Sequence, residues 1–142
     1  MPRRKRDKKQ NAMAAGPTRD QLCLKGRLWV EKQGQTYLSW GRVVLLERID
    51  QLGSVSAAAR SMEMSFAHAW KLVKEMNRLA ATPLVEKRTG GRGGGGAWLT
   101  PAGKQAVSEF WSLVADFQEW ISHKQPAEPG QAEPGARRRT SK

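Results

Sequence analysis

The sequence predicts a mainly α-helical fold with a small β wing and a long last helix. The first observation behind this is a series of short apolar-periodic segments between residues 39 and 81, each preceded by serine and separated by glycine or a polar turn. The second is a glycine-rich run, at 90–96, between two short apolar segments that can pair as strands. The third is a long apolar-periodic segment that begins at Thr100-Pro101. The spacing of apolar residues, the helix-capping residues and the glycines or prolines that end an element distinguish helices from hairpins.

The first element expected is a strand over Leu22–Val30, where apolar and polar residues alternate, followed by a turn at 33–35. Ser39 is a suitable N-cap for a helix over Trp40–Leu52, and Gly53 ends it. Its apolar residues have helical spacing: Val44, Leu45, Ile49 and Leu52.

Two further helices are expected around a tight turn. Ser54 caps the first, over Val55–Met62, whose centre is three alanines that let a neighbouring helix approach closely. Residues 63–64 form the turn, and Ser65 caps the second helix, over Phe66–Ala81. This order predicts a helix-turn-helix, although an ordinary pair of core helices with a solvated basic face would show similar periodicity.

The second of these helices has two distinct faces. One carries apolar residues at helical steps, for a core: Ala69, Leu72, Val73, Met76, Leu79 and Ala80. The other carries Lys71, Lys74 and Arg78 in line with Ala67. Cations in line on the second helix of a helix-turn-helix are typical of a helix that enters a DNA groove.

A two-stranded wing is expected next, from strands at 84–89 and 97–99. The glycines between them formally match a dinucleotide-binding fingerprint, but that motif must join a strand directly to a helix, so we reject it. A wing tip is the better interpretation, because Lys87, Arg88 and Arg92 supply charge and arginine enters narrow minor grooves. A mobile linker with incidental arginines is the alternative.

The last helix is expected over 101–123, with Thr100 as N-cap and Pro101 at its first position. Its apolar face is wider than one small domain needs to cover. We expect a dimer seam there, although the face could simply close the core of the chain. The residues assigned to this interface are Leu24, Leu28, Phe110, Leu113, Val114, Phe117, Trp120 and Ile121.

Charge points to a polyanionic partner. The chain of 142 residues has 25 lysines and arginines against 13 acidic residues, a formal net charge of +12. The excess lies mostly in the ends, so we expect a disordered basic arm over 1–20, one folded domain over 21–123, and a disordered Pro/Gly-rich and basic tail over 124–142.

Several function classes are excluded by the residue types present. Cys23 is the only cysteine, so neither an internal disulfide nor zinc-finger spacing is available. No apolar stretch approaches the roughly 18 residues needed to cross a bilayer, and no apolar stretch follows the basic start as in a signal peptide. His68 and His123 lie far apart without metal-ligand partners. We therefore expect no metal, no cofactor, no membrane partner and no enzymatic activity, and a cytoplasmic, nucleoid-associated protein of bacterial type.

These motifs resemble a known family. The segment Gly53–Arg60 resembles the helix-turn-helix opening of LysR-type regulators. The segments Ser65–Asn77 and Thr89–Thr100 resemble the N-terminal DNA-binding domain of ModE-type molybdate-responsive regulators, and the glycine wing is the most specific part. The resemblance covers residues 22–123 and implies a winged helix-turn-helix homodimer with its recognition helix in the major groove. Family members commonly have a basic residue at the position of Ala67, and they carry C-terminal molybdate-binding modules that we do not expect here, so no direct molybdate binding is predicted.

The expected function is that of a dimeric, sequence-specific regulator of transcription that binds double-stranded DNA. Two alternatives stay open: a protein-interaction module that dimerises with a longer regulator and modulates it, and a non-specific, nucleoid-type DNA binder. The residues assigned to DNA binding come from the helix starts, the cationic face and the wing: Ser54, Ser65, Phe66, Ala67, His68, Lys71, Lys74, Arg78, Lys87, Arg88 and Arg92.

Overall fold

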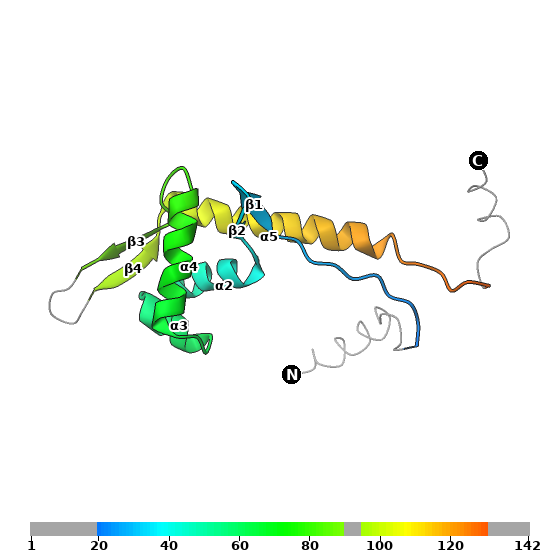
Figure 1. Ribbon diagram of the computed structural model, residues 1–142, viewed down its shortest axis with the longest axis horizontal. Coiled ribbons are helices and arrows are strands. Elements are labelled where there is room, and N and C mark those ends of the chain that lie inside the picture. The colour runs from blue at the N-terminus through cyan, green and yellow to red at the C-terminus, as the bar shows by residue number, and fades with distance from the viewer. Residues whose placement is uncertain (1–19, 90–94, 131–142) are drawn as a thin grey trace, which may run out of the picture. The chain divides into compact units, whose positions relative to one another are not determined.

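The computed structural model describes residues 20–89 and 95–130. Four helices and two short antiparallel hairpins occupy these residues, which confirms the mainly α fold with a small wing and a long last helix. In chain order (Figure 1) the elements are β1 (Val30–Lys32), β2 (Gln35–Leu38), α2 (Trp40–Leu52), α3 (Val55–Ser61), α4 (Phe66–Leu79), β3 (Val85–Arg88), β4 (Gly96–Leu99) and α5 (Pro101–Ser122).

The chain divides into two units. Arg27–Gln118 forms a compact unit that holds both hairpins and most of the helices. The other unit contains the residues before and after it, of which 20–26 and 119–130 are described.

The strand expected over Leu22–Val30 is wrong for all but its last residue. Residues 22–29 are not strand, and β1 begins at Val30. Side chains bind the backbone of this segment where a partner strand would otherwise do so. The Gln125 amide accepts from the Leu24 N–H at 2.9 Å and donates to the Leu24 carbonyl at 3.3 Å. The alternation of apolar and polar residues therefore predicted too long a strand, because a strand also requires a neighbouring strand to pair with.

A hairpin that the sequence did not predict follows. β1 and β2 pair around Gln33 and Gly34, whose φ angles of 57° and 73° are both left-handed. Two left-handed residues in a row match the twist of a tight two-residue hairpin turn. The turn expected at this place is confirmed, and β2, which follows it, is a strand that the sequence did not predict.

Helix α2 begins and ends where the caps predicted. Ser39 Oγ accepts from the Arg42 N–H, and Gly53 has a φ of 81°, which ends the helix in the left-handed region. The buried face differs from the expected one, because Leu52 is 48% exposed. Helix α2 instead buries residues that face α3, α4 and the wing strand β4: Val43, Leu45, Leu46 and Ile49.

Helices α3 and α4 form the expected pair around a tight turn. Ser54 and Ser65 are their N-caps, with side chains that accept from the N–H groups of Ala57 and His68. Glu63 turns the chain between them with a left-handed φ of 57°. Helix α4 ends two residues earlier than predicted, because Ala80 is already extended with ψ 147°.

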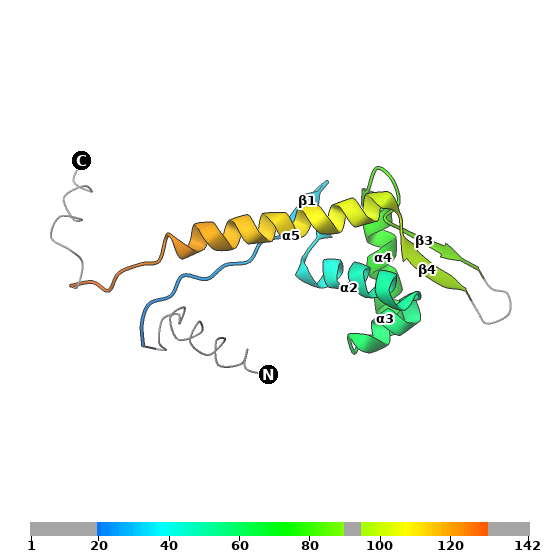
Figure 2. The same ribbon diagram turned by 180° about the vertical axis from the view of Figure 1, so that it is seen from behind.

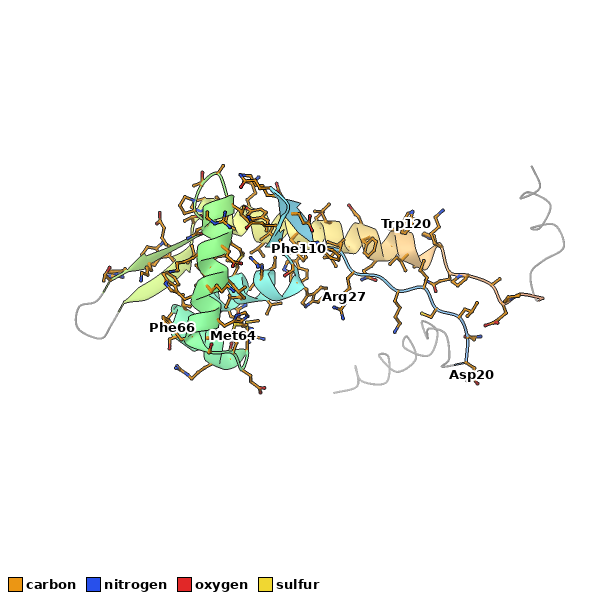
Figure 3. The ribbon with its side chains drawn as sticks, in the orientation of Figure 1. Asp20, Arg27, Met64, Phe66, Phe110 and Trp120 are labelled. Atoms are coloured by element: carbon orange, nitrogen blue, oxygen red, sulfur yellow. The ribbon has the colours of Figure 1, made fainter. Side chains whose placement is uncertain are left out.

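The core lies between α2, α3, α4, the base of the wing and the first half of α5. Phe110 (Figure 3) is 1% exposed within it. Figure 2 shows the same unit from behind, with α5 alongside α2 and the wing strands extending beyond them. No helix among the described residues is long and apolar enough to span a membrane.

Candidate nucleic-acid interface

The exposed face of α4 carries the predicted cations. Lys71, Lys74 and Arg78 are all exposed, as is Ala67, while the opposite face buries Ala69, Val73, Met76 and Leu79. The cationic face is slightly hollowed over residues 66–78. A helix buried along one side and cationic along the other can be inserted into a groove without disturbing the core.

The one carboxylate on this face of α4, that of Glu75, forms an ion pair with an arginine of α2. Glu75 lies beside Lys71 and Lys74, and its Oε1 is 2.8 Å from Nη2 of Arg42 on α2. Side-chain exposures of 14% for Arg42 and 32% for Glu75 place the pair partly out of solvent, where attraction is less screened. The pair joins α2 to α4 and leaves the face with a net positive charge.

Arg78 is anchored at the far end of the same face. Its Nη2 donates to Oε1 of Gln35 in β2, at 2.5 Å. The unpredicted hairpin β1–β2 thus holds one of the predicted DNA-binding side chains. This bond orients the guanidinium but leaves four of its five N–H donors for other acceptors.

The start of α4 presents an aromatic ring and a histidine. Phe66 is 54% exposed at the first helical position, directly after the turn that holds Met64 (Figure 3), and His68 is exposed one residue after Ala67. The hydroxyl of Ser65 accepts from the His68 N–H at 3.0 Å. Ser65 and Ser54 therefore first serve as helix caps, and a DNA contact from either would be additional to that role.

The wing is fixed to the helix-turn-helix by backbone bonds. The Ala97 N–H donates to the Gly53 carbonyl at 2.9 Å, and the Leu99 N–H donates to Oδ1 of Asp50 at 3.1 Å. Gly96 lies so close that an added Cβ would be 3.3 Å from the Gly53 oxygen. Strand β4 consequently packs against the junction of α2 and α3.

Asn77 joins the other wing strand to α4. Its Oδ1 accepts from the N–H groups of Leu84 and Val85 at 2.8 and 3.1 Å, and its Nδ2 donates to the Val85 carbonyl at 3.0 Å. The Asn77 side chain thus makes the backbone hydrogen bonds that a neighbouring strand would otherwise make, at the start of β3. The wing cations Lys87 and Arg88 follow directly and are exposed.

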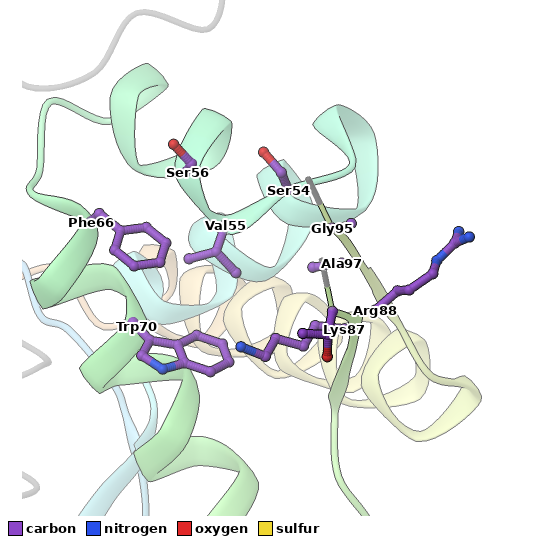
Figure 4. Close-up of a pocket in the computed structure, with 11 residues that line it drawn as sticks. Ser54, Val55, Ser56, Phe66, Trp70, Lys87, Arg88, Gly95 and Ala97 are labelled. Carbon is purple, nitrogen blue, oxygen red and sulfur yellow. The ribbon is translucent and has the colours of Figure 1, made fainter. Parts of the chain in front are cut away.

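A hollow of about 240 Å³ lies between the helix-turn-helix and the wing (Figure 4). Hydroxyls, aromatic rings and wing cations surround it, from Ser54, Ser56, Phe66, Trp70, Lys87 and Arg88. The structure thus brings most of the predicted DNA-binding residues to two adjoining surfaces: the cationic face of α4 and this hollow. Arg92 and most of the glycine run lie outside the described residues, as Gly90–Gly94 are not described.

Sequence reasoning missed residues that position the interface. Asn77 lies near the end of α4 and bonds to the start of β3, and Arg42 on α2 bonds to Glu75 on α4, so no local pattern relates the segments that they join. Ser56 on α3 lines the hollow beside the wing. Trp70 was recognisable only as an aromatic residue on the recognition helix. No group of acidic, histidine or cysteine side chains in the described ranges could hold a metal ion.

Comparison with known proteins agrees with this geometry. Residues 40–104 match the family model of the bacterial regulatory helix-turn-helix proteins of the LysR family. This segment is therefore similar to the helix-turn-helix domain of the LysR family. The match spans α2, α3, α4 and the wing, and it ends in the first turn of α5.

Similar proteins include two with molybdenum in their names. The chain is 43% identical over 81 residues to the molybdenum-pterin-binding protein MopB of Rhodobacter capsulatus. The aligned segment covers 57% of this chain and 30% of that protein. It is 38% identical over 92 residues to the molybdenum transport protein ModE of Azotobacter vinelandii, covering 65% of this chain and 34% of that protein. It is 37% identical over 92 residues to the DNA-binding transcriptional dual regulator ModE of Escherichia coli, with coverages of 65% and 35%.

The chain thus spans about a third of the length of the curated relatives it matches. These matches confirm the resemblance to the DNA-binding domain of ModE-type regulators. The relatives are named as a regulator, a transport protein and a binding protein and not as enzymes, in agreement with the expectation of no catalytic activity.

Proposed function

We propose that this chain is a sequence-specific regulator of transcription that binds double-stranded DNA as a homodimer. Helix α4 enters the major groove, where side chains at its start contact base edges and Lys71, Lys74 and Arg78 contact phosphates. The wing lies on the adjacent backbone or minor groove, with Arg88 and Arg92 as its cations. We assign this activity to the bacterial cytoplasm, at the nucleoid.

One observation carries the proposal. The cationic face of α4 is exposed along its whole length, and the wing is bonded to the same helix-turn-helix through Gly53, Asp50 and Asn77. Helix α4 and the wing strands are therefore joined by hydrogen bonds into one surface. The helix-turn-helix match and the regulator among the similar proteins support the same conclusion.

The dimer is proposed on the exposed apolar residues of α5. Leu113 is 48% and Trp120 is 54% exposed, and Val114 and Phe117 are half-buried. Phe110 and Ile121, at 1% and 7% exposed, are covered within their own chain and have little surface to offer a partner. A two-fold axis through such an interface would place two recognition helices on a palindromic site.

Selection of bound duplexes from a random DNA pool tests the proposal. The expected result is one enriched motif with two-fold symmetry, bound at least about a thousandfold more tightly than random duplex. Equal binding of all sequences would identify a nucleoid-type binder and overturn the proposal. No shift of any duplex, together with a stable complex formed with a longer regulator, would identify a protein-interaction module.

A further inference from the structure

The two neighbouring cations of the wing, Lys87 and Arg88, point to opposite sides of it. The register pairs Lys87 with Ala97 and Arg88 with Gly96. Successive residues of a strand face opposite sides, so Lys87 shares a face with Val85, Ala97 and Leu99. Those three residues are 4%, 4% and 6% exposed, so this face is the one that packs on the domain.

Lys87 therefore lies at the outer, exposed end of the face that packs on the domain. Its ammonium contacts the indole of Trp70 on α4, since Lys87 Nζ is 4.4 Å from the ring centroid. A cation at this distance over an indole face is attracted by the electron density of the ring. Figure 4 shows Lys87 extending across the hollow toward Trp70, while Arg88 points away from it.

We infer that Lys87 is a positioning residue: it fixes the wing against the recognition helix through Trp70, and Arg88 is the neighbouring cation that contacts DNA phosphate. This inference rests on the proposed function for the role of Arg88, but the contact between Lys87 and Trp70 exists without DNA. It revises the equal role in DNA binding that the sequence suggested for both cations. It also gives Trp70, which packs against the edge of the core, a second function.

The contact itself is tested on the DNA-free chain by nuclear magnetic resonance. Protons on the ε-carbon of Lys87 are expected upfield of ordinary lysine values, because they lie over the indole ring. The Trp70→Leu variant should abolish that shift, and Trp70→Phe, which keeps an aromatic face, should retain part of it. An ordinary Lys87 shift in the unchanged protein would overturn the inference.

The division of roles is tested by the salt dependence of binding to the duplex obtained from the random pool. Arg88→Met should lower the slope of log affinity against log salt by about 0.9, the value for one lost phosphate contact. Lys87→Met removes the same charge and keeps the aliphatic stem, and it should leave the slope unchanged. Its affinity should fall roughly two- to fivefold, the equivalent of one exposed cation–π contact. Lys87→Arg should restore the affinity, because guanidinium also stacks on indole.

The two variants should also combine differently with Trp70→Leu. Lys87→Met in that background should cost no further affinity, whereas Arg88→Met should cost its full amount, because residues that act as a unit are not additive. A slope lowered equally by Lys87→Met and Arg88→Met would overturn the inference. If no duplex is bound by the unchanged protein, the proposed function fails, while the proton shifts still decide whether Lys87 and Trp70 are joined.

Discussion

Gly103 is the residue whose identity the packing constrains most directly. It lies in the first turn of α5, and a Cβ built on it would overlap the Leu84 carbonyl oxygen. No real Cβ approaches an oxygen so closely, and the obstructing atom belongs to the backbone. The same close approach lets the Thr100 N–H reach the Leu84 carbonyl at 2.9 Å, which joins α5 to the base of the wing.

We therefore expect Gly103→Ala to destabilise the protein by roughly 1–3 kcal/mol, the usual range for overpacking. Gly41→Ala is the matched control, since Gly41 is also in the first turn of a helix but has no atom within 4 Å of its added Cβ. That variant should be neutral or more stable by up to about 1 kcal/mol. Urea denaturation of both variants measures the difference, and equal stabilities would contradict the close approach.

Tyr37 is the only tyrosine of the chain, so its phenol can be titrated without interference from another. Burial raises its pKa above the ordinary value of 10.0, and the negative charge of Glu109 raises it further. The neutral phenol is favoured in the folded state. Its contribution to stability is therefore complete below pH 10 and is lost as the pH rises through the folded-state pKa.

Phenolate absorbance in the ultraviolet should accordingly show a higher midpoint in the native protein than in denaturant. Tyr37→Phe should lose less stability than the unchanged protein between pH 10 and the alkaline limit of folding. Glu109→Gln should lower the native midpoint without returning it to the ordinary value, since burial is the larger cause. A native midpoint at or below that of the denatured chain would contradict this account.

At the scale of elements, the wing depends on the end of α4. Asn77→Ala would leave the N–H groups of Leu84 and Val85 without their acceptor at the start of β3, where both residues are buried. The expected loss is about 2–3 kcal/mol, because unpaired buried donors cost more than a hydrogen bond contributes on average.

Asn77→Asp is the control for this prediction. It keeps the acceptor of both N–H groups but puts a carboxylate oxygen in place of the donor to the Val85 carbonyl, so it should lose less stability than Asn77→Ala. Thermal unfolding measures both variants. Equal losses in the two would show that the donor, and not the acceptor, holds the strand.

The cationic face of α4 is a property of that helix as a whole. Lys71→Ala should weaken binding of the selected duplex and lower its salt slope by about 0.9, without changing the unfolding midpoint, because the side chain is exposed. Arg92→Ala should do the same if the wing tip contacts DNA. Lys104→Ala, on α5, removes an equally exposed charge outside this face and should leave the slope unchanged. Equal effects of Lys71 and Lys104 would indicate attraction by overall charge alone.

At the scale of the whole molecule, the net charge of +12 and the exposed apolar residues of α5 have different consequences. The charge favours any polyanion and is screened by salt. The apolar residues are those of the proposed dimer interface, because burial of apolar surface drives association between copies.

Leu113→Glu should therefore shift the chain from dimer to monomer in sedimentation, since a carboxylate would have to be desolvated in the interface. It should also weaken binding to a palindromic duplex far more than to a half-site. Ser112→Glu adds the same charge at the adjacent exposed position and should leave the dimer intact. An unchanged dimer in Leu113→Glu would place the interface elsewhere.

The sequence by itself determined the helices, their caps and the wing, because these depend on local chemistry. Serine before an apolar-periodic segment and glycine or proline after it fix helix ends through a few neighbouring backbone groups, and the observed ends agree within two residues. The helical period alone also assigned Lys71, Lys74 and Arg78 to one exposed face.

Only the tertiary structure decided which segments and side chains find partners. The alternating segment after Leu22 did not pair as a strand, and the hairpin at 30–38 did. Two adjacent wing cations, equivalent in sequence, were separated by the register of β3 on β4 into one that meets Trp70 and one that points outward. Such differences arise between groups far apart along the chain, whose meeting depends on how every intervening element packs.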